Sequence, residues 1–309
     1  MSVPVVLPGY NSSLIPETTS AKVQKNGTIV AAVSITKLSK AQGYCVVHFL
    51  DKNLRNKIVT LKEDVAIEAG SDNTLELGEV VSSPVDKRLL RVYIQVHHLL
   101  PEQYLIEHLV NQLSEAVLGS LNLELTKNVT IDFYDTGADK VFRDAAGFIV
   151  GERFCMHAIT VDSAKAEKVL KACQGVTVTK TTEKDLEKII SYDNTLSGFK
   201  REDFVEYLSR NSSILLATQD NEVVGYISGK GPEIYGVYGE SEEIGDHLLL
   251  EYINKLSPPS ITLKSKYGYW KNLLSVATKT RSICRRHTRH CPKLKWDKIF
   301  AANVGMNLY

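Results

Sequence analysis

The order of predicted elements repeats on either side of residue 175, and this repetition constrains the fold more than any other feature. Each half contains a hairpin, a strand followed by a loop and a helix, and then further strands in a similar order. The length of 309 residues also exceeds the usual size of one hydrophobic core. The sequence therefore predicts two domains, 1–174 and 175–309, each of mixed α/β class with a partly antiparallel central sheet flanked by helices.

Local patterns place the elements of the first half. Asn26-Gly27 between two β-prone arms is typical of a type I′ hairpin. Ile58, Leu61 and Ala69 repeat at helical spacing before Gly70, which predicts a helix with a glycine C-cap. Strands are predicted at 44–50, 73–81, 89–99, 129–134 and up to 161, and helices at 101–119, 138–145 and up to Cys173.

In the second half, capping and turn residues mark the ends of the predicted elements more clearly. Thr182 is a plausible N-cap for a helix over 186–190, and a second helix is expected around Phe204. Asp220-Asn221 separates the two strands of a hairpin. The strongest amphipathic stripe runs over 244–256 and stops before Pro258. A strand at 261–263 and a closing segment at 298–309 complete the predicted order.

Composition excludes several classes of protein. Charged residues make up 24% of the chain and its net charge is +1, so no overall charge favours a nucleic acid or a membrane surface. Five scattered cysteines do not fit a disulfide framework. The first 16 residues lack the basic start of a signal peptide, and no segment has the ~20 apolar residues of a membrane span. We therefore expect a cytoplasmic protein with no membrane partner.

Three segments of the first half, 44–61, 69–80 and 138–148, resemble the GNAT superfamily of N-acetyltransferases, within a subgroup that carries two such units in one chain. Residues 44–61 are similar to its strand, pyrophosphate loop and helix, with Arg55 on the arginine of the R-G-x-G-x-G/A loop. Residues 69–80 and 138–148 are similar to its next strand and to a later helix that ends in Gly-Phe. Residues 82–135 stand out as an insertion within this pattern.

The second half carries more of the same resemblance. Residues 192–201 resemble the subgroup's tyrosine-aspartate followed by glycine and arginine, and residues 214–227 are similar to its central hairpin. Residues 285–289 and 296–309 resemble its carboxyl terminus. The turn 240–245 holds three carboxylates where a pyrophosphate would bind, so we read it as structural and the second unit as a substrate-shaping or pseudo-duplicate module.

The resemblance implies acetyl-CoA as cosubstrate, bound by the first unit. Backbone N–H groups at a helix N-terminus bind a pyrophosphate, and glycines let that backbone approach closely. Here the three glycine positions hold Asn56, Ile58 and Thr60. Arg55 and Lys57 keep a positive charge near the expected phosphates, but these two side chains are equally well interpreted as solvated charges on the surface. The predicted cofactor-binding residues are Phe49, Leu50, Arg55, Asn56, Lys57, Ile58, Val59 and Thr60.

Catalysis in this family requires a base for the amine and often an acid for the leaving thiolate. The family's tyrosine acid is matched here by Phe142, so Tyr134 is the nearby candidate acid, alongside a packing interpretation. Glu76 and Glu79 are candidate bases if their strand lines the cleft. Asp193 and Arg201 are candidate substrate-binding residues, or a structural ion pair, because a turn with Gly198 separates them.

The C-terminal stretch 279–295 combines basic residues with four metal-ligand types, Cys284, His287, His290 and Cys291. Adjacent His290 and Cys291 fit no usual zinc spacing, so no metal site is predicted. We read the basic residues as a solvated face, with nucleic acid an improbable partner. Two hypotheses follow: an acyl-CoA-dependent N-acetyltransferase acting on a small-molecule or protein amine, or a catalytically silent GNAT-like module that binds a small molecule or a protein.

Overall fold

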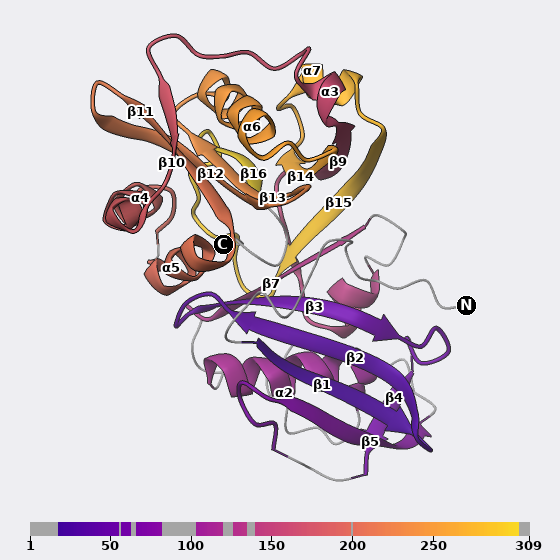
Figure 1. Ribbon diagram of the computed structural model, residues 1–309. Helices are drawn as coiled ribbons and strands as arrows, with labels where there is room; N and C mark the ends of the chain where they lie inside the picture. The colour runs from indigo at the N-terminus through magenta and orange to yellow at the C-terminus, as the bar shows by residue number, and fades with distance from the viewer. Residues whose placement is uncertain are drawn as a thin grey trace. The chain divides into compact units, whose positions relative to one another are not determined.

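The computed structural model describes residues 18–55, 57–62, 66–81, 103–119, 126–134, 140–198 and 200–302 (Figure 1). Two compact units emerge: unit 1 is Met1–Glu152 with Cys284–Cys291, and unit 2 is Arg153–Ile283 with Pro292–Tyr309. Strand β15 (Lys279–His287) runs from unit 2 into unit 1. The domain limits 1–174 and 175–309, which follow from the repeated order of elements, stay a prediction. Unit 2 begins before residue 175, at Arg153. Its first strand, β9 (Met156–Asp162), pairs along its whole length with β14 (Ser260–Lys266) of the same unit.

Unit 1 is built on an antiparallel meander. Strands β1 (Thr18–Lys25), β2 (Thr28–Lys37) and β3 (Gln42–Leu50) pair in sequence order. Asn26 and Gly27 have φ angles of 52° and 77°, which are the positive values that a type I′ turn needs. The predicted first hairpin and the strand after it are confirmed.

The remaining strands of unit 1 extend this sheet on both sides. β3 pairs in parallel with β7 (Asn128–Tyr134), which lies next to β15, and β1 pairs in parallel with β5 (Asp72–Val81). The order is β15, β7, β3, β2, β1, β5, then β4 (Ile58–Leu61) and β6 (Gln103–Tyr104). A short strand β8 (Val150–Gly151) also pairs with β15.

The helix predicted to begin near Ile58 is wrong, because residues 58–61 form strand β4. Ile58 and Val59 pair with β5 on one side and with β6 on the other, and both side chains are buried. Their β-branched side chains suit a strand. The apolar spacing within such a short segment does not distinguish a helix from a strand. Residues 63–65, where that helix was expected to continue, lie outside the described residues.

Helix α2 (Leu105–Leu118) packs on β1, β2 and β3 and closes the core of unit 1. Its apolar face carries Ile106, Val110 and Leu113, and Gly119 follows it with a φ of 76°. The predicted helix, its buried face and its end are confirmed. The short helix expected over 138–145 is a π-helical turn, η3 (Val141–Ala145), in its described part, and the strand expected at 89–99 lies outside the described residues.

The strands of unit 2 form a mixed sheet with helices on both faces. The sheet order is β10, β11, β12, β13, β14, β9, β15. Their bounds are β10 (Thr177–Lys180), β11 (Ser213–Gln219), β12 (Glu222–Lys230), β13 (Glu233–Gly239) and, pairing with β13, β16 (Ile299–Ala302). The helices are α3 (Ser163–Ala166), η4 (Glu183–Asp185), α4 (Leu186–Asp193), α5 (Glu202–Asn211), α6 (Glu242–Leu256) and α7 (Lys271–Ser275).

The two faces of this sheet bury different side chains. Helix α6 packs Leu248 and Leu249 against Leu215 and Val237 of the strands. Helices α4 and α5 contact β12 and β11, and α4 places Asp193 beside Tyr226, whose side chain points to the opposite face from that of neighbouring Ile227. The predicted 244–256 stripe, the Thr182 start and the second hairpin are confirmed, whereas the helix expected up to Cys173 ends at Ala166.

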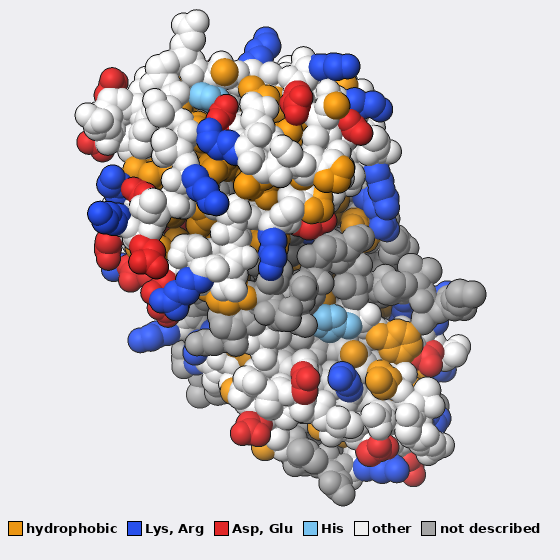
Figure 2. All heavy atoms as spheres, in the orientation of Figure 1, with side chains coloured by type: hydrophobic (Ala, Val, Ile, Leu, Met, Phe, Trp, Pro, Cys, Tyr) orange, Lys and Arg blue, Asp and Glu red, His pale blue; other side chains and the backbone are white. Residues whose placement is uncertain are grey.

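The face of the molecule drawn in Figure 2 shows no dominant sign of charge. On the face in Figure 2, Lys and Arg side chains are interspersed with Asp and Glu, in keeping with a net charge of +1. Within the described residues, no helix combines the length and the apolar character required to span a bilayer.

Candidate functional site

Strands β3 and β7 of unit 1 pair only at their beginnings. Gln42–Cys45 lie beside residues 128–131, after which β3 continues to Leu50 and β7 to Tyr134. Among the described residues, no strand pairs with β3 on this side after Cys45. Among the described residues of unit 1, this backbone edge of β3 is therefore a place where an extended ligand could add as a strand.

His48 lies on this same stretch of β3. Its Nε2 is 2.8 Å from the Oγ of Ser34, which is fully buried on the neighbouring strand β2. Burial, with a smaller contribution from the charge of Lys22, lowers the pKa of His48 below its ordinary value of 6.5. The imidazole is thus neutral at pH 7 and able to accept a proton. His48 was not among the predicted site residues, although it is the only basic side chain in its strand.

The corresponding place in unit 2 is filled by the chain itself. β13 and β14 are parallel but pair at a single position, Glu233 with Thr262. Strand β16 pairs antiparallel with β13 from Gly236 to Tyr238, and all four of its residues are at most 1% exposed. Phe300 lies so close to α6 that a Cβ on Gly245 would stand 3.2 Å from its ring. An extended ligand therefore has no open strand edge at this part of β13.

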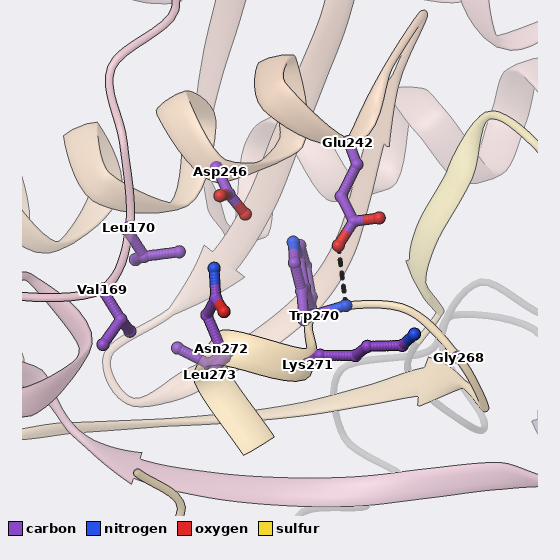
Figure 3. A pocket seen from close by; sticks show the side chains of 9 residues that line it. All are labelled: Val169, Leu170, Glu242, Asp246, Gly268, Trp270, Lys271, Asn272 and Leu273. Atoms are coloured by element: carbon purple, nitrogen blue, oxygen red, sulfur yellow. Dashed lines mark hydrogen bonds between the residues drawn. The ribbon is translucent and has the colours of Figure 1, made fainter. Parts of the chain in front are cut away.

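A hollow of about 330 Å³ opens at the N-terminal end of α6 (Figure 3). Glu242 and Asp246 enter it from α6, and Glu242 Oε1 accepts a hydrogen bond from the backbone N–H of Trp270 at 2.8 Å. Burial and then the charge of Glu242 raise the pKa of Asp246 to about 6. Two carboxylates at this helix start disfavour a phosphate, in agreement with the structural interpretation of the 240–245 turn.

The predicted cofactor-binding residues fall into two structural groups. Phe49 and Leu50 end β3, and Arg55 and Lys57 belong to the turn that follows, where Leu54 N donates to Asp51 O at 3.0 Å. Ile58, Val59 and Thr60 lie in β4, so no helix N-terminus stands at these three positions. Asn56 lies outside the described residues.

Among the predicted cofactor-binding residues, Arg55 has a polar atom that lacks a hydrogen-bond partner in the described part of the chain, as expected of a residue that binds an anion. Its side chain is half-buried, and its Nε is buried without a hydrogen-bond partner among the described residues. A buried, unpartnered guanidinium nitrogen is costly unless an anion or another acceptor completes it. Lys57, two residues later, is exposed.

The two predicted catalytic residues do not lie together. Glu76 is on β5 and its carboxylate is 4.0 Å from Lys62 Nζ, with both side chains largely exposed. Tyr134 ends β7, four strands away in the sheet, which corresponds to about 19 Å at the usual strand spacing of about 4.8 Å. Glu79 lies near the end of β5 and is exposed as well. One reaction centre cannot use both Glu76 and Tyr134.

Phe142 is a core residue. It is 1% exposed, and its ring centroid is 4.6 Å from that of Phe133. A tyrosine at this position would bury its hydroxyl in an apolar cluster, so the position cannot present a general acid to a substrate.

Asp193 and Arg201 meet as the sequence predicted, but inside the core of unit 2. Arg201 Nε and Nη2 donate to the two carboxylate oxygens at 2.8 Å and 2.6 Å, and both side chains are at most 2% exposed. Tyr226 donates a third hydrogen bond to Asp193, and the guanidinium lies 5.5 Å from the ring centroid of Tyr238. The structure therefore supports the ion-pair alternative.

Comparisons with known proteins were made by sequence and by structure. A family model described as a domain of unknown function, DUF7596, matches residues 8–150. No curated protein matches the sequence significantly. A candidate acetyltransferase from Pyrococcus horikoshii matches the structure with a TM-score of 0.52 and 10% identity, covering 91% of this chain and 77% of the other. The likeness shows a shared fold.

Two further solved structures are similar at lower scores. A GCN5-related N-acetyltransferase from Sphaerobacter thermophilus gives a TM-score of 0.45 and 12% identity, over 86% of this chain and 79% of its own. A tandem GNAT protein from the clavulanic acid biosynthesis pathway gives 0.46 and 10%, over 90% and 85%. The predicted fold class, mixed α/β with partly antiparallel sheets flanked by helices, is confirmed.

Proposed function

We propose that the chain is an acyl-CoA-dependent N-acetyltransferase with two GNAT-like units, in which unit 1 binds acetyl-CoA and transfers the acetyl group to an amine. The observation that carries this proposal is the edge of β3 beyond Cys45, which passes beside neutral His48. The amide groups of the cosubstrate's arm would pair with that edge as an added strand. The fold shared with the Pyrococcus horikoshii candidate acetyltransferase agrees with it.

His48 would serve as the general base. The amine nitrogen attacks the thioester carbonyl carbon, the C–S bond breaks, and the acetyl group passes to nitrogen as an amide. The proton lost by the amine goes to the imidazole, directly or through a water molecule, while the departing thiolate takes a proton from solvent. A neutral imidazole suits this role, because a protonated one could not accept that proton.

Unit 2 would not bind acetyl-CoA itself. β16 occupies the edge of β13 that corresponds to the proposed binding edge of β3, and Glu242 and Asp246 line the start of α6. One cosubstrate per chain is the expected stoichiometry.

The Arg55→Ala variant tests the binding of the cosubstrate. In calorimetric titration with acetyl-CoA, we expect it to weaken binding by ~10–100-fold, the effect of losing one charge-assisted hydrogen bond to a phosphate. The matched control is Lys57→Ala, which removes an exposed charge from the same turn and should change affinity less than about threefold. Equal losses in both variants would indicate a general charge effect and contradict a specific role for Arg55.

The His48→Gln variant tests the chemical step. At pH 7.5, we expect the rate of thiol release with an accepted amine to fall by at least about 10²-fold, with unchanged affinity for acetyl-CoA. In the wild-type protein, kcat/KM should rise with pH through a pKa below 6.5 and level off above it, because the base is active when neutral. An unchanged rate in His48→Gln would remove His48 from the mechanism.

A second function is favoured by the acidic caps of both long helices. The carboxylate of buried Glu107 accepts a hydrogen bond from Tyr104 N at 3.2 Å at the start of α2, and α6 begins with Glu242 and Glu243. Neither N-terminus offers free amides and positive charge to a pyrophosphate. The alternative is a catalytically silent GNAT-like module that binds a small molecule or a protein. Absence of any heat of binding with acetyl-CoA would select this alternative.

A further inference from the structure

Three metal-ligand side chains from separate segments converge in unit 1. The ligand atoms of Glu152, His287 and Cys291 all lie within 4.8 Å of one another. His287 ends strand β15, Glu152 follows the adjacent strand β8, and Cys291 lies in the segment after β15. The pairing of β8 with β15 therefore brings Glu152 next to a residue 135 positions away. Sequence spacing alone could not reveal this combination.

The imidazole of His287 is fixed in one orientation. Its Nδ1 is 2.8 Å from Thr130 Oγ1, which also receives a hydrogen bond from Gln42 Nε2 at 2.9 Å. Its Nε2 therefore points to the other side, 3.3 Å from Glu152 Oε2. The side chain of His287 is fully buried and that of Glu152 is 4% exposed. A hydrogen-bonding partner on one ring nitrogen, with the other nitrogen turned toward the metal, is the arrangement that orients histidine ligands in metal sites.

The spacing of the three ligand atoms is compatible with a shared cation. Because Thr130 contacts Nδ1, Nε2 is the ring nitrogen that lies 3.3 Å from Glu152 Oε2, and the Sγ of Cys291 lies within 4.8 Å of the ligand atoms of both residues. In a nucleophile–histidine–carboxylate arrangement, the thiol and the carboxylate would contact opposite ring nitrogens. Two ligands at about 2.0–2.1 Å from a tetrahedral zinc ion lie about 3.3–3.4 Å apart, which matches the distance between Nε2 and Oε2.

The charges also fit a divalent ion. A carboxylate, a thiolate and a neutral imidazole sum to two negative charges, and the neighbouring Arg285 donates two hydrogen bonds of 2.9 Å to Asp132 and also interacts electrostatically with Glu152. The Cys291 thiol now donates to Gly151 O at 3.4 Å and would release its proton to solvent on binding. His290 does not belong to the cluster; its carbonyl oxygen accepts a hydrogen bond from Asn128.

We infer that Glu152, His287 and Cys291 form a binding site for a divalent transition metal, with zinc as the ion that best suits sulfur, nitrogen and oxygen donors together. Three protein ligands leave a fourth tetrahedral position, which water would complete beside half-buried Cys291.

The test uses the full chain, treated with a chelator and kept reduced. Titration with Co²⁺ should produce the thiolate-to-cobalt charge-transfer band and the intense visible bands of tetrahedral cobalt, saturating at one ion per chain. Zn²⁺ should then abolish these bands by displacing cobalt, and it should raise the melting temperature of the protein.

Three variants assign the site. Cys291→Ser should lose the charge-transfer band and bind Zn²⁺ at least ~100-fold more weakly, while the matched control Cys155→Ser, which removes an exposed thiol of unit 2, should behave as wild type. Thr130→Val should keep the band and weaken binding by ~10–100-fold, because the imidazole loses its orienting partner. Circular dichroism checks that each variant is folded.

Two results would overturn the inference. The first is a wild-type protein that gives no charge-transfer band at saturating Co²⁺. The second is a folded Cys291→Ser variant that retains the band, or a Cys155→Ser variant that loses it, since the metal would then be bound elsewhere. If Cys291→Ser does not fold, Glu152→Gln replaces it, with weaker Zn²⁺ binding expected and unchanged binding counting against the site.

Discussion

Replacing Asp193 with asparagine is expected to lower the free energy of unfolding of unit 2 by about 3–5 kcal/mol. The substitution removes the charge that compensates the Arg201 guanidinium, which is 1% exposed and has no access to water. Tyr226 also loses its charged acceptor. Both tryptophans, Trp270 and Trp296, belong to unit 2, so urea unfolding followed by tryptophan fluorescence measures this loss.

An exposed ion pair on the next helix provides the control. Glu206 and Arg210 are one turn apart on α5, with side chains 42% and 71% exposed. Glu206→Gln should therefore change the free energy of unfolding by only ~0.3–0.5 kcal/mol. If Asp193→Asn proved as mild as this control, the buried pair would not stabilise unit 2, and a ligand-binding role for Asp193 would regain weight.

Replacing Phe300 with alanine is expected to destabilise unit 2 by about 3–5 kcal/mol. Phe300 is 1% exposed, its ring centroid is 5.1 Å from that of Tyr269, and it seals β16 against Gly245 of α6. Truncation removes the transfer free energy of the ring and leaves a cavity that a close-packed core fills only in part. The same fluorescence-detected unfolding in urea measures the change.

Tyr267→Ala is the matched control, because that tyrosine is an aromatic residue of the same unit and is 67% exposed. It should change stability by at most about 1 kcal/mol, the size of its ring contact with His157. A Phe300→Ala variant with wild-type stability would show that β16 is only loosely held on β13. Unit 2 could then open its strand edge, and a second acetyl-CoA per chain would be expected.

Local patterns in the sequence were sufficient where the physics is local. The turn residues Asn26-Gly27 and Asp220-Asn221 adopt the positive φ angles that their hairpins need. At the helix starts, Thr182 forms a capping box with Asp185, and the Ser241 side chain accepts a hydrogen bond from Ile244 N. The 244–256 stripe predicted α6 because one face of a helix repeats every 3.6 residues. The order of predicted strands and helices in each half predicted the mixed α/β fold class, because elements that are adjacent in sequence usually pack together.

Local patterns failed where a distant segment decided the outcome. Ile58 and Leu61 fit a helix by spacing, but both pair with β5, and Ile58 also pairs with β6, so the segment is a strand. Glu76 and Tyr134 looked like partners until the sheet order separated them by four strands. Phe142 packs against Phe133 in the core, and the spacing of residues in the sequence does not predict this contact.

The sequence by itself therefore determined the turns, the helix faces, the fold class and the Asp193–Arg201 pairing across a short turn. Tertiary structure alone decided which strand edge is covered by β16, that His48 faces the buried hydroxyl of Ser34, and that Glu152 and Cys291 lie near His287. The physical reason is that hydrogen bonds between strands and the convergence of side chains depend on residues far apart in the chain, whose proximity is set by the packing of the whole unit.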